Sequence, residues 1–147
     1  MAIPTIRSAT VEDCAILAGL IGQLGYEVTT AAVAERLAAM EADGRPVLVA
    51  DLDGEVVGCL STSVMRVLHR PAPVGRISMM VVDGAVRGRS IGAELVRAAE
   101  RILVAAGCRL VEVTSNLART DAHRFYERLG YERTSVRLSR DAPESPP

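Results

Sequence analysis

The sequence has no lysine, few cysteines and no long apolar run. All 17 basic residues are arginine, and 18 carboxylates bring the formal net charge to −1. This balance argues against a general nucleic-acid-binding protein, which carries an excess of positive charge. The three cysteines, Cys14, Cys59 and Cys108, are an odd number at wide spacings, with no pair at metal-ligand spacing. We therefore expect buried, reduced thiols and no metal site.

The ends of the sequence bear on location and domain organisation. No charged and then apolar leader begins it, and no apolar run approaches membrane-spanning length, so we expect a cytoplasmic protein. Residues 140–147 are polar and rich in proline and are expected to form a flexible tail. The remaining residues, 1–139, are expected to form a single domain around one core.

Hydrophobic periodicity and turn residues predict a mixed α/β domain without internal repeats. Thr10 followed by Asp13 is a capping-box signature for the first helix, and Asp53-Gly54 favours a two-residue hairpin turn. The unit from 76 to 114 is expected to be a right-handed parallel crossover. The predicted strands cover residues 3–7, 47–52, 55–64, 76–82, 109–114 and 131–138, and the predicted helices 10–24, 30–42, 90–106 and 119–129.

A glycine-containing loop between a predicted strand and a long helix is the main candidate for a ligand site. Glycine lets backbone approach a ligand closely, and the free N–H groups at a helix start point at an anion. No Gly-Lys-Ser/Thr closes the loop, and the glycine pattern of dinucleotide folds is absent, which leaves coenzyme A among the common ligands. The loop reads Arg87, Gly88, Arg89, Ser90, Ile91, Gly92, Ala93.

Two motifs in this order resemble the GNAT acetyltransferase superfamily. The family's acetyl-CoA motif is Arg or Gln, two residues, Gly, one residue, Gly or Ala, and the segment from Arg87 to Gly92 matches it except at Ser90, where Gly is usual. Ser90 either adopts positive φ, at a strain of roughly 1 kcal/mol, or caps the helix with its hydroxyl. The second motif is the last predicted helix, with Phe125-Tyr126 and the ending Leu129-Gly130-Tyr131.

The resemblance implies a GNAT-like fold that binds acetyl-CoA as cosubstrate. Its central mixed, twisted sheet has about six or seven strands with helices on both faces, and strand 76–82 splays from strand 109–114 to admit the pantetheine arm. Only the main chain of the central strand is expected to touch the coenzyme there. The implied coenzyme-binding residues are Met80, Val81, Val82, Arg87, Gly88, Arg89, Ser90, Ile91, Gly92, Ala93, Asn116 and Tyr126.

The resemblance also implies direct attack of an amine on the thioester, with Tyr126 as the general acid that protonates the departing thiolate. An amine of pKa about 10 arrives as ammonium and needs a base. Glu27, Glu112 and His69 are the candidates, and deprotonation through water is an alternative.

The predicted activity is therefore transfer of acetyl to a primary amine of a small molecule, such as an amino compound or an aminoglycoside-like substrate. In this family residues 24–30 and 66–75 are expected to set the acceptor. Alternatives are a protein N-terminus or lysine as acceptor, and a coenzyme A binding or sensing domain without turnover. No nucleic-acid or membrane partner is expected, and a homodimer is possible because the family often forms one.

Overall fold

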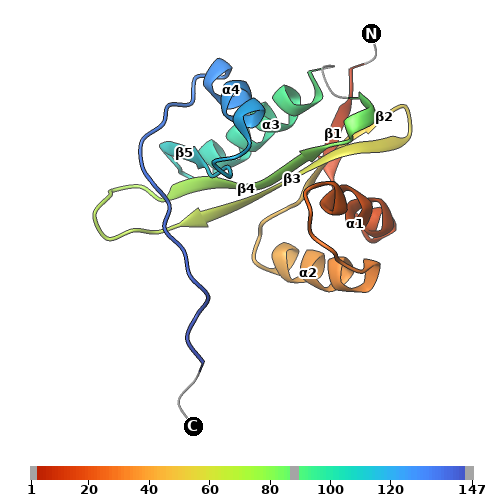
Figure 1. Cartoon of the computed structure of the whole chain (residues 1–147), viewed down its shortest axis with the longest axis horizontal. Coiled ribbons are helices and arrows are strands. Elements are labelled where there is room, and N and C mark those ends of the chain that lie inside the picture. Colours follow the sequence, from red (N-terminus) through yellow and green to blue (C-terminus); the bar gives the residue numbers. More distant parts are fainter. Residues whose placement is uncertain (1–2, 87–89, 145–147) are drawn as a thin grey trace. The chain divides into compact units, whose positions relative to one another are not determined.

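A computed structural model describes residues 3–86 and 90–144 of the chain (Figure 1). It divides into two compact units, Met1–Val113 and Thr114–Pro147, which are described separately. The first unit contains β1 (Thr5–Ser8), α1 (Cys14–Gln23), α2 (Thr30–Ala42), β2 (Leu48–Leu52), β3 (Glu55–Met65), β4 (Val74–Val82), α3 (Ile91–Ala105) and β5 (Leu110–Val113). The second unit contains α4 (Thr120–Arg128).

The first unit is built on one mixed sheet with the strand order β1-β2-β3-β4-β5. Strands β1 to β4 pair with one another in antiparallel fashion, and β5 pairs parallel to β4 after the α3 crossover. Helices α1 and α2 cover one face of this sheet and α3 covers the other (Figure 1). The predicted mixed α/β architecture, with helices on both faces, is confirmed.

The turn between β2 and β3 is the one that Asp53-Gly54 predicts. Asp53 has φ 53° and Gly54 has φ 91°, both in the left-handed region that a two-residue hairpin turn requires. The Gly54 N–H donates to Asp51 Oδ1 at 2.8 Å, which adds a side-chain bond to the turn.

The start of the first helix is held by a buried carboxylate. Asp13 is 6% exposed; Arg7 donates to its two oxygens at 2.8 and 3.0 Å, and the Thr10 N–H donates at 2.7 Å. Arg7 also donates to Asp51 at 3.3 Å, so β1, β2 and the helix start are joined. The hydrogen bonds from Arg7, followed by those from Thr10, hold the pKa of Asp13 below its ordinary value. The turn Val11–Asp13 is 3₁₀, which is why α1 begins later than predicted.

Helix α3 packs directly on the backbone of the sheet. Its side chains Ile91, Leu95 and Leu103 are at most 2% exposed. A Cβ at Gly58 of β3 would lie 3.2 Å from Leu95 Cδ1, and a Cβ at Gly75 of β4 would lie 3.0 Å from both Leu103 methyl groups. Glycine at these two strand positions therefore permits the close approach of the helix.

On the opposite face, α1 and α2 pack on the sheet through an apolar cluster. The cluster includes Leu17, Leu20, Val33 and Leu37 from the helices. It also includes Val49, Cys59 and Val81 from the strands. All three cysteines are free and buried, as predicted. None of the helices among the described residues is both long and apolar enough to cross a bilayer.

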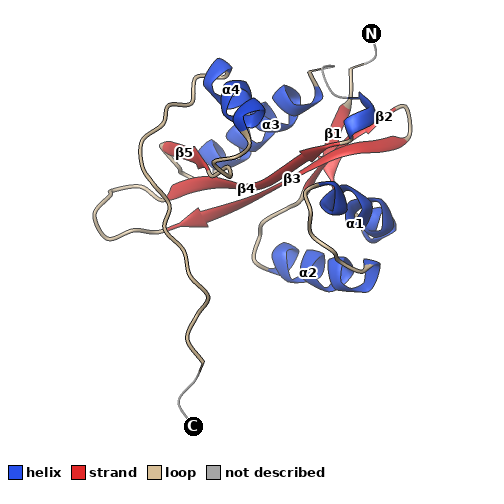
Figure 2. Ribbon diagram, in the orientation of Figure 1, coloured by secondary structure: helices blue, strands red, loops and turns tan. Residues whose placement is uncertain are grey.

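The predicted last strand, residues 131–138, is wrong, and the described residues contain five strands rather than the expected six or seven. Residues 131–144 of the second unit have no regular secondary structure (Figure 2). Val136 and Leu138 are 81% and 90% exposed. The alternation of apolar and polar residues is not enough for a strand, because a strand also needs main-chain hydrogen bonds with a neighbouring strand, and residues 131–138 form no such pairing.

Candidate active site

The central strand β4 has a stretch of backbone that β5 does not pair. Parallel pairing runs from Val74 opposite Leu110 to Ile77 opposite Val113, and β4 then continues to Val82. Met80, Val81 and Val82 pair with β3 on their other side. Among the described strands none pairs with this stretch on its β5 side, so alternate N–H and C=O groups there are open to another partner. This is the edge at which the family resemblance places pantetheine.

A β-bulge lies where the β5 pairing ends. In the register of β3 and β4, Ser61 is opposite Met79 and Thr62 is opposite Ile77, which leaves Ser78 as the extra residue of β4. The Ser61 and Ser78 hydroxyls are 2.9 Å apart and share a hydrogen bond. Bulges of this kind re-aim side chains and end pairing, and they often lie next to active sites.

The predicted anion site at the start of α3 is described from Ser90 onward, and Arg87, Gly88 and Arg89 lie outside the described residues. Ser90 has φ 61° and ψ 13°, and its side chain makes no capping bond, so the positive-φ alternative is the one adopted. Its carbonyl accepts from the Glu94 N–H at 3.1 Å, the first bond of the helix. The N–H groups of the first turn, from Ile91 to Ala93, precede that bond and are directed out of the helix end.

A cavity of about 290 Å³ lies between α1, α2 and the sheet, and it was not predicted. Ser61 and Met79, the residue pair next to the bulge, form part of its sheet side. The lining residues are Leu17, Ile21, Tyr26, Val28, Val33, Arg36, Leu37, Met40, Val47, Cys59, Ser61 and Met79. The sequence contains one indication of the cavity. Arg36 occupies a position in the i, i+3, i+4, i+7 stripe of α2 where an apolar residue is expected.

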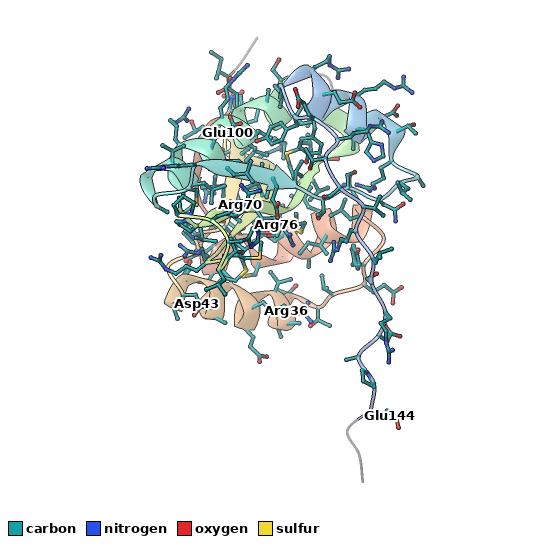
Figure 3. The ribbon with its side chains drawn as sticks, turned by 90° about the vertical axis from the view of Figure 1, so that its left-hand side faces the viewer. Arg36, Asp43, Arg70, Arg76, Glu100 and Glu144 are labelled. Carbon is teal, nitrogen blue, oxygen red and sulfur yellow. The ribbon has the colours of Figure 1, made fainter. Side chains whose placement is uncertain are left out.

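The predicted bases lie on different elements. Glu27 is exposed in the connection between α1 and α2, between two residues that line the cavity. Glu112 on β5 accepts two hydrogen bonds from Arg76 of β4, at 2.9 Å from Nε and 2.5 Å from Nη2. Arg76 is labelled in Figure 3. His69 is exposed in the connection between β3 and β4. None of the three is among the described residues that line the cavity.

In the second unit, Tyr126 of α4 is buried in an aromatic cluster. It is 8% exposed, and its ring meets Phe125 edge to face with centroids 5.0 Å apart and Tyr131 at 5.8 Å. Burial raises the pKa of Tyr126 to about 12, with a smaller opposing effect of Arg119. The phenol is therefore protonated throughout the range in which enzymes work, as a proton donor must be.

Asn116, at the start of the second unit, is partly used by its own turn. Its Oδ1 accepts from the Ala118 N–H at 2.9 Å, and its carbonyl lies 2.9 Å from His123 Nε2. No hydrogen bond of the described residues engages its side-chain NH₂ group. The structure thus gives Asn116 a turn role, and its two amide donors are not engaged by the described residues.

No cluster of His, Cys, Asp or Glu side chains suited to a metal ion occurs within residues 3–86 and 90–144. The described donors are instead main-chain groups along β4 and at the start of α3, which suit a pyrophosphate attached to an amide-bearing arm. The residues present therefore fit coenzyme A.

Comparisons with known proteins agree with this fit. The sequence matches the Acetyltransferase (GNAT) family over residues 16–131. It is 34% identical over 145 residues to the aminoalkylphosphonate N-acetyltransferase of Salmonella typhimurium, covering 95% of this chain and 92% of that protein. A solved structure of a transcriptional regulator from Bacillus halodurans C-125 is 26% identical with a TM-score of 0.86, covering 95% and 99% of the two chains.

An aminoglycoside N-acetyltransferase solved in complex with CoA shares the fold. Its TM-score is 0.83 at 21% identity, and the match covers 97% of this chain and 96% of that one. The family uses acetyl-CoA. The family match spans the elements that carry the open edge of β4, the α3 N-terminus and the α4 tyrosine, so the chain belongs to the GNAT acetyltransferase family and is an acyl-CoA-dependent N-acetyltransferase.

Proposed function

We propose that the protein transfers acetyl from acetyl-CoA to the primary amine of a small molecule. The observation that carries the acceptor class is the 290 Å³ cavity, which meets β4 at the bulge where β5 pairing stops. That volume is near the lower limit for small-molecule sites. The relative at 34% identity, named for a small aminoalkyl acceptor, supports the same class. A protein N-terminus or lysine is the less favoured acceptor.

The coenzyme is proposed to bind along the free edge of β4 and at the start of α3. Main-chain groups of Met80, Val81 and Val82 bind the pantetheine arm, and the N–H groups from Ser90 to Ala93, with Arg87, Gly88 and Arg89, bind the pyrophosphate. The left-handed Ser90 supports this assignment, because strain of roughly 1 kcal/mol in a non-glycine residue is often retained where backbone must approach a ligand. Asn116 adds its free amide donors.

Tyr126 is proposed as the general acid. Bound acetyl-CoA supplies an activated thioester, and the role of the protein is to place the amine and to protonate the thiolate that leaves. Since the pKa of Tyr126 is raised to about 12, the phenol is always in the donating form near neutral pH. A positioned donor contributes about 10²–10⁴-fold to such a step.

Glu27 is proposed as the base, acting through water. Glu112 is the weaker candidate, because Arg76 holds its carboxylate with two hydrogen bonds. No hydrogen bond or ion pair of the described residues involves the Glu27 carboxylate, and its neighbours Tyr26 and Val28 line the cavity. Glu27→Gln is expected to shift the acidic limb of the kcat/KM pH profile. An unchanged profile would show that solvent water alone takes the proton from the acceptor amine.

Cys59 supports direct attack rather than a two-step route through an acetylated cysteine. Its side chain lines the cavity but is 0% exposed, and burial raises its pKa to about 12. A thiol in this state is not a nucleophile at neutral pH, since the thiolate is the reactive form.

Turnover of a Tyr126→Phe variant tests the proposal. Release of free thiol from acetyl-CoA with an amine acceptor is expected to fall about 100-fold, while coenzyme affinity by calorimetry stays near that of the natural protein. Tyr131→Phe is the matched control, because it removes the hydroxyl of the neighbouring ring in the same cluster and is expected to keep full turnover. If both variants turn over equally fast, Tyr126 is not the general acid and only packs in the aromatic cluster.

A further inference from the structure

The lining of the cavity between α1, α2 and the sheet is apolar apart from a few groups. Tyr26, Arg36 and Ser61 supply its polar atoms, and Arg36 is the one charged residue among the described residues that line it. No carboxylate stands beside it in this described part of the lining. Small-molecule sites are typically built in this way, with a few polar groups that fix orientation on an apolar wall.

Arg36 takes part in no hydrogen bond or ion pair among those the described residues make, although the fold pairs other arginines. Arg7 is held by Asp13 and Asp51, and Arg76 by Glu112. Arg36 lies on α2, labelled in Figure 3, and its side chain is exposed as well as lining the cavity. Arg36 is thus both exposed and part of the lining, and no described residue engages the five donors of its guanidinium.

The polar residues of the cavity lining come from different layers of the first unit. Arg36 is on α2, which covers the cavity, while Ser61 and Met79 are on the strands beneath it, beside the bulge at Ser78. A short acceptor has room to reach from one to the other. In the proposed placement its amine lies beside Ser61 and Met79, and its other end meets the guanidinium.

We infer that Arg36 binds an anionic group of the acceptor, so that the substrate is a short-chain primary amine bearing a phosphonate or a carboxylate. This inference rests on the proposed small-molecule acetyltransferase function. A guanidinium forms paired, charge-assisted hydrogen bonds with the oxygens of either group. The relative named for aminoalkylphosphonates is consistent with an acceptor of this chemistry.

The same lining disfavours polycationic acceptors such as aminoglycosides. A second ammonium group beside Arg36 meets like charge, and no carboxylate among the described lining residues offsets it. Cation-binding pockets need acidic or aromatic walls, and here the aromatic contribution is Tyr26 alone.

A matched series of amines tests the inference by free thiol release from acetyl-CoA. The acceptors are 2-aminoethylphosphonate, β-alanine, propylamine and 1,3-diaminopropane, which share a short chain and differ in the charge of the far end. We expect kcat/KM to be at least about tenfold higher for the phosphonate or the carboxylate than for propylamine, with the diamine lowest. Comparing the phosphonate with the carboxylate identifies which anion the site prefers.

Variants of Arg36 show whether this residue sets the preference. Arg36→Gln is expected to lower the anionic-to-neutral ratio of kcat/KM by about 10- to 100-fold, mainly through KM for the anionic acceptor. Arg36→Lys restores part of the ratio, and Arg36→Glu shifts the preference toward the diamine. Arg101→Gln, on the exposed surface of α3, removes the same charge and is the control expected to leave all ratios unchanged.

The outcomes separate this inference from the proposed function. If propylamine or the diamine is acetylated as well as the anionic amines, or if Arg36→Gln changes every acceptor equally, Arg36 does not bind an anionic group although the enzyme still acetylates small amines. If coenzyme binds but none of the four amines releases thiol above hydrolysis, the small-amine function itself is wrong. Unfolding midpoints of the variants within a few degrees of the natural protein ensure that the ratios report binding.

Discussion

The two faces of the sheet in the first unit are packed differently. Helix α3 approaches so closely that a Cβ at Gly58 or Gly75 would lie only 3.2 or 3.0 Å from its leucines, which are fully buried. Helices α1 and α2 on the other face leave a 290 Å³ cavity with one arginine among its described lining residues. The closely packed face carries the helix start that is proposed to hold the coenzyme, and the looser face carries the cavity that is proposed to hold the acceptor. In the proposed function, the two substrates therefore place opposite demands on packing density.

The largest expected effect concerns the α3 side. Gly92→Trp is expected to lower coenzyme affinity more than about 100-fold, about 3 kcal/mol, because the indole occupies the space in which the pyrophosphate meets the first helical turn. Calorimetric titration with CoA measures this change. Ala105→Trp, at the exposed far end of the same helix, is the control for folding. If Gly92→Trp binds CoA with unchanged affinity, the coenzyme does not bind at this helix end.

On the α1 and α2 side, filling the cavity is expected to affect the acceptor alone. Val28→Phe places a larger side chain among the lining residues and should lower kcat/KM for the acceptor about 10- to 100-fold at unchanged coenzyme affinity. Val104→Phe, on the exposed side of α3, is the matched control. Weakened coenzyme binding with normal acceptor kinetics would place the acceptor elsewhere.

The Arg7 and Asp13 pair joins α1 to the sheet and supplies a pH-dependent part of stability. Asp13→Asn is expected to cost about 1–2 kcal/mol of unfolding free energy at neutral pH, allowing for the partial exposure of Arg7. Because the folded-state pKa of Asp13 is lowered, its contribution is present above the ordinary value of 3.8 and is lost as pH falls through the lower folded pKa. Denaturant unfolding at several pH values measures this.

A control substitution at an exposed carboxylate checks that prediction. Asp121 of the second unit is fully exposed and 3.9 Å from Arg124, so Asp121→Asn should leave stability unchanged at every pH. If the free energy of unfolding of Asp13→Asn stays below that of the natural protein at acidic pH, the substitution removes packing rather than a charge interaction.

Single methyl groups added to the two faces test how closely each face is packed. Gly75→Ala is expected to destabilise by about 1–3 kcal/mol, because the new Cβ meets the fully buried Leu103 at 3.0 Å. Gly19→Ala on α1, where nothing lies within 4 Å, should stabilise by about 0.5–1 kcal/mol through helix propensity. Thermal unfolding of both variants compares the packing directly, and equal shifts would contradict the difference between the faces.

Elements with strong local signals could be predicted from the sequence. Helix α2 has its predicted bounds, 30–42, because the apolar stripe and a following Asp-Gly agree. The Asp53-Gly54 hairpin likewise needs only positive φ at two residues. Strand β4 begins two residues earlier than predicted, at Val74, since its pairing with Met65 extends past the proline-containing loop.

Features that depend on distant partners could not be predicted. The strand expected at residues 131–138 has the right alternation, yet pairing is a property of two strands. The open edge of β4 follows from where β5 stops, and the bulge at Ser78 follows from the register with β3. Tyr126 and Asn116, assigned by resemblance, and the candidate bases Glu27 and Glu112 stay predictions. The Tyr126 and Glu27 variants test two of them.

By itself, the sequence determined the family and the order of most elements, because these depend on short motifs and on periodicity within single segments. The coenzyme loop at residues 87–93 stays a prediction from one of those motifs. It left two conformations open for Ser90, and the tertiary structure decided for positive φ. Only the tertiary structure decided that α1, α2, two strands and their connections enclose a cavity and that Arg36 lines it. A cavity is bounded by residues far apart in the chain, so its shape and its single charge exist only once those segments have packed together.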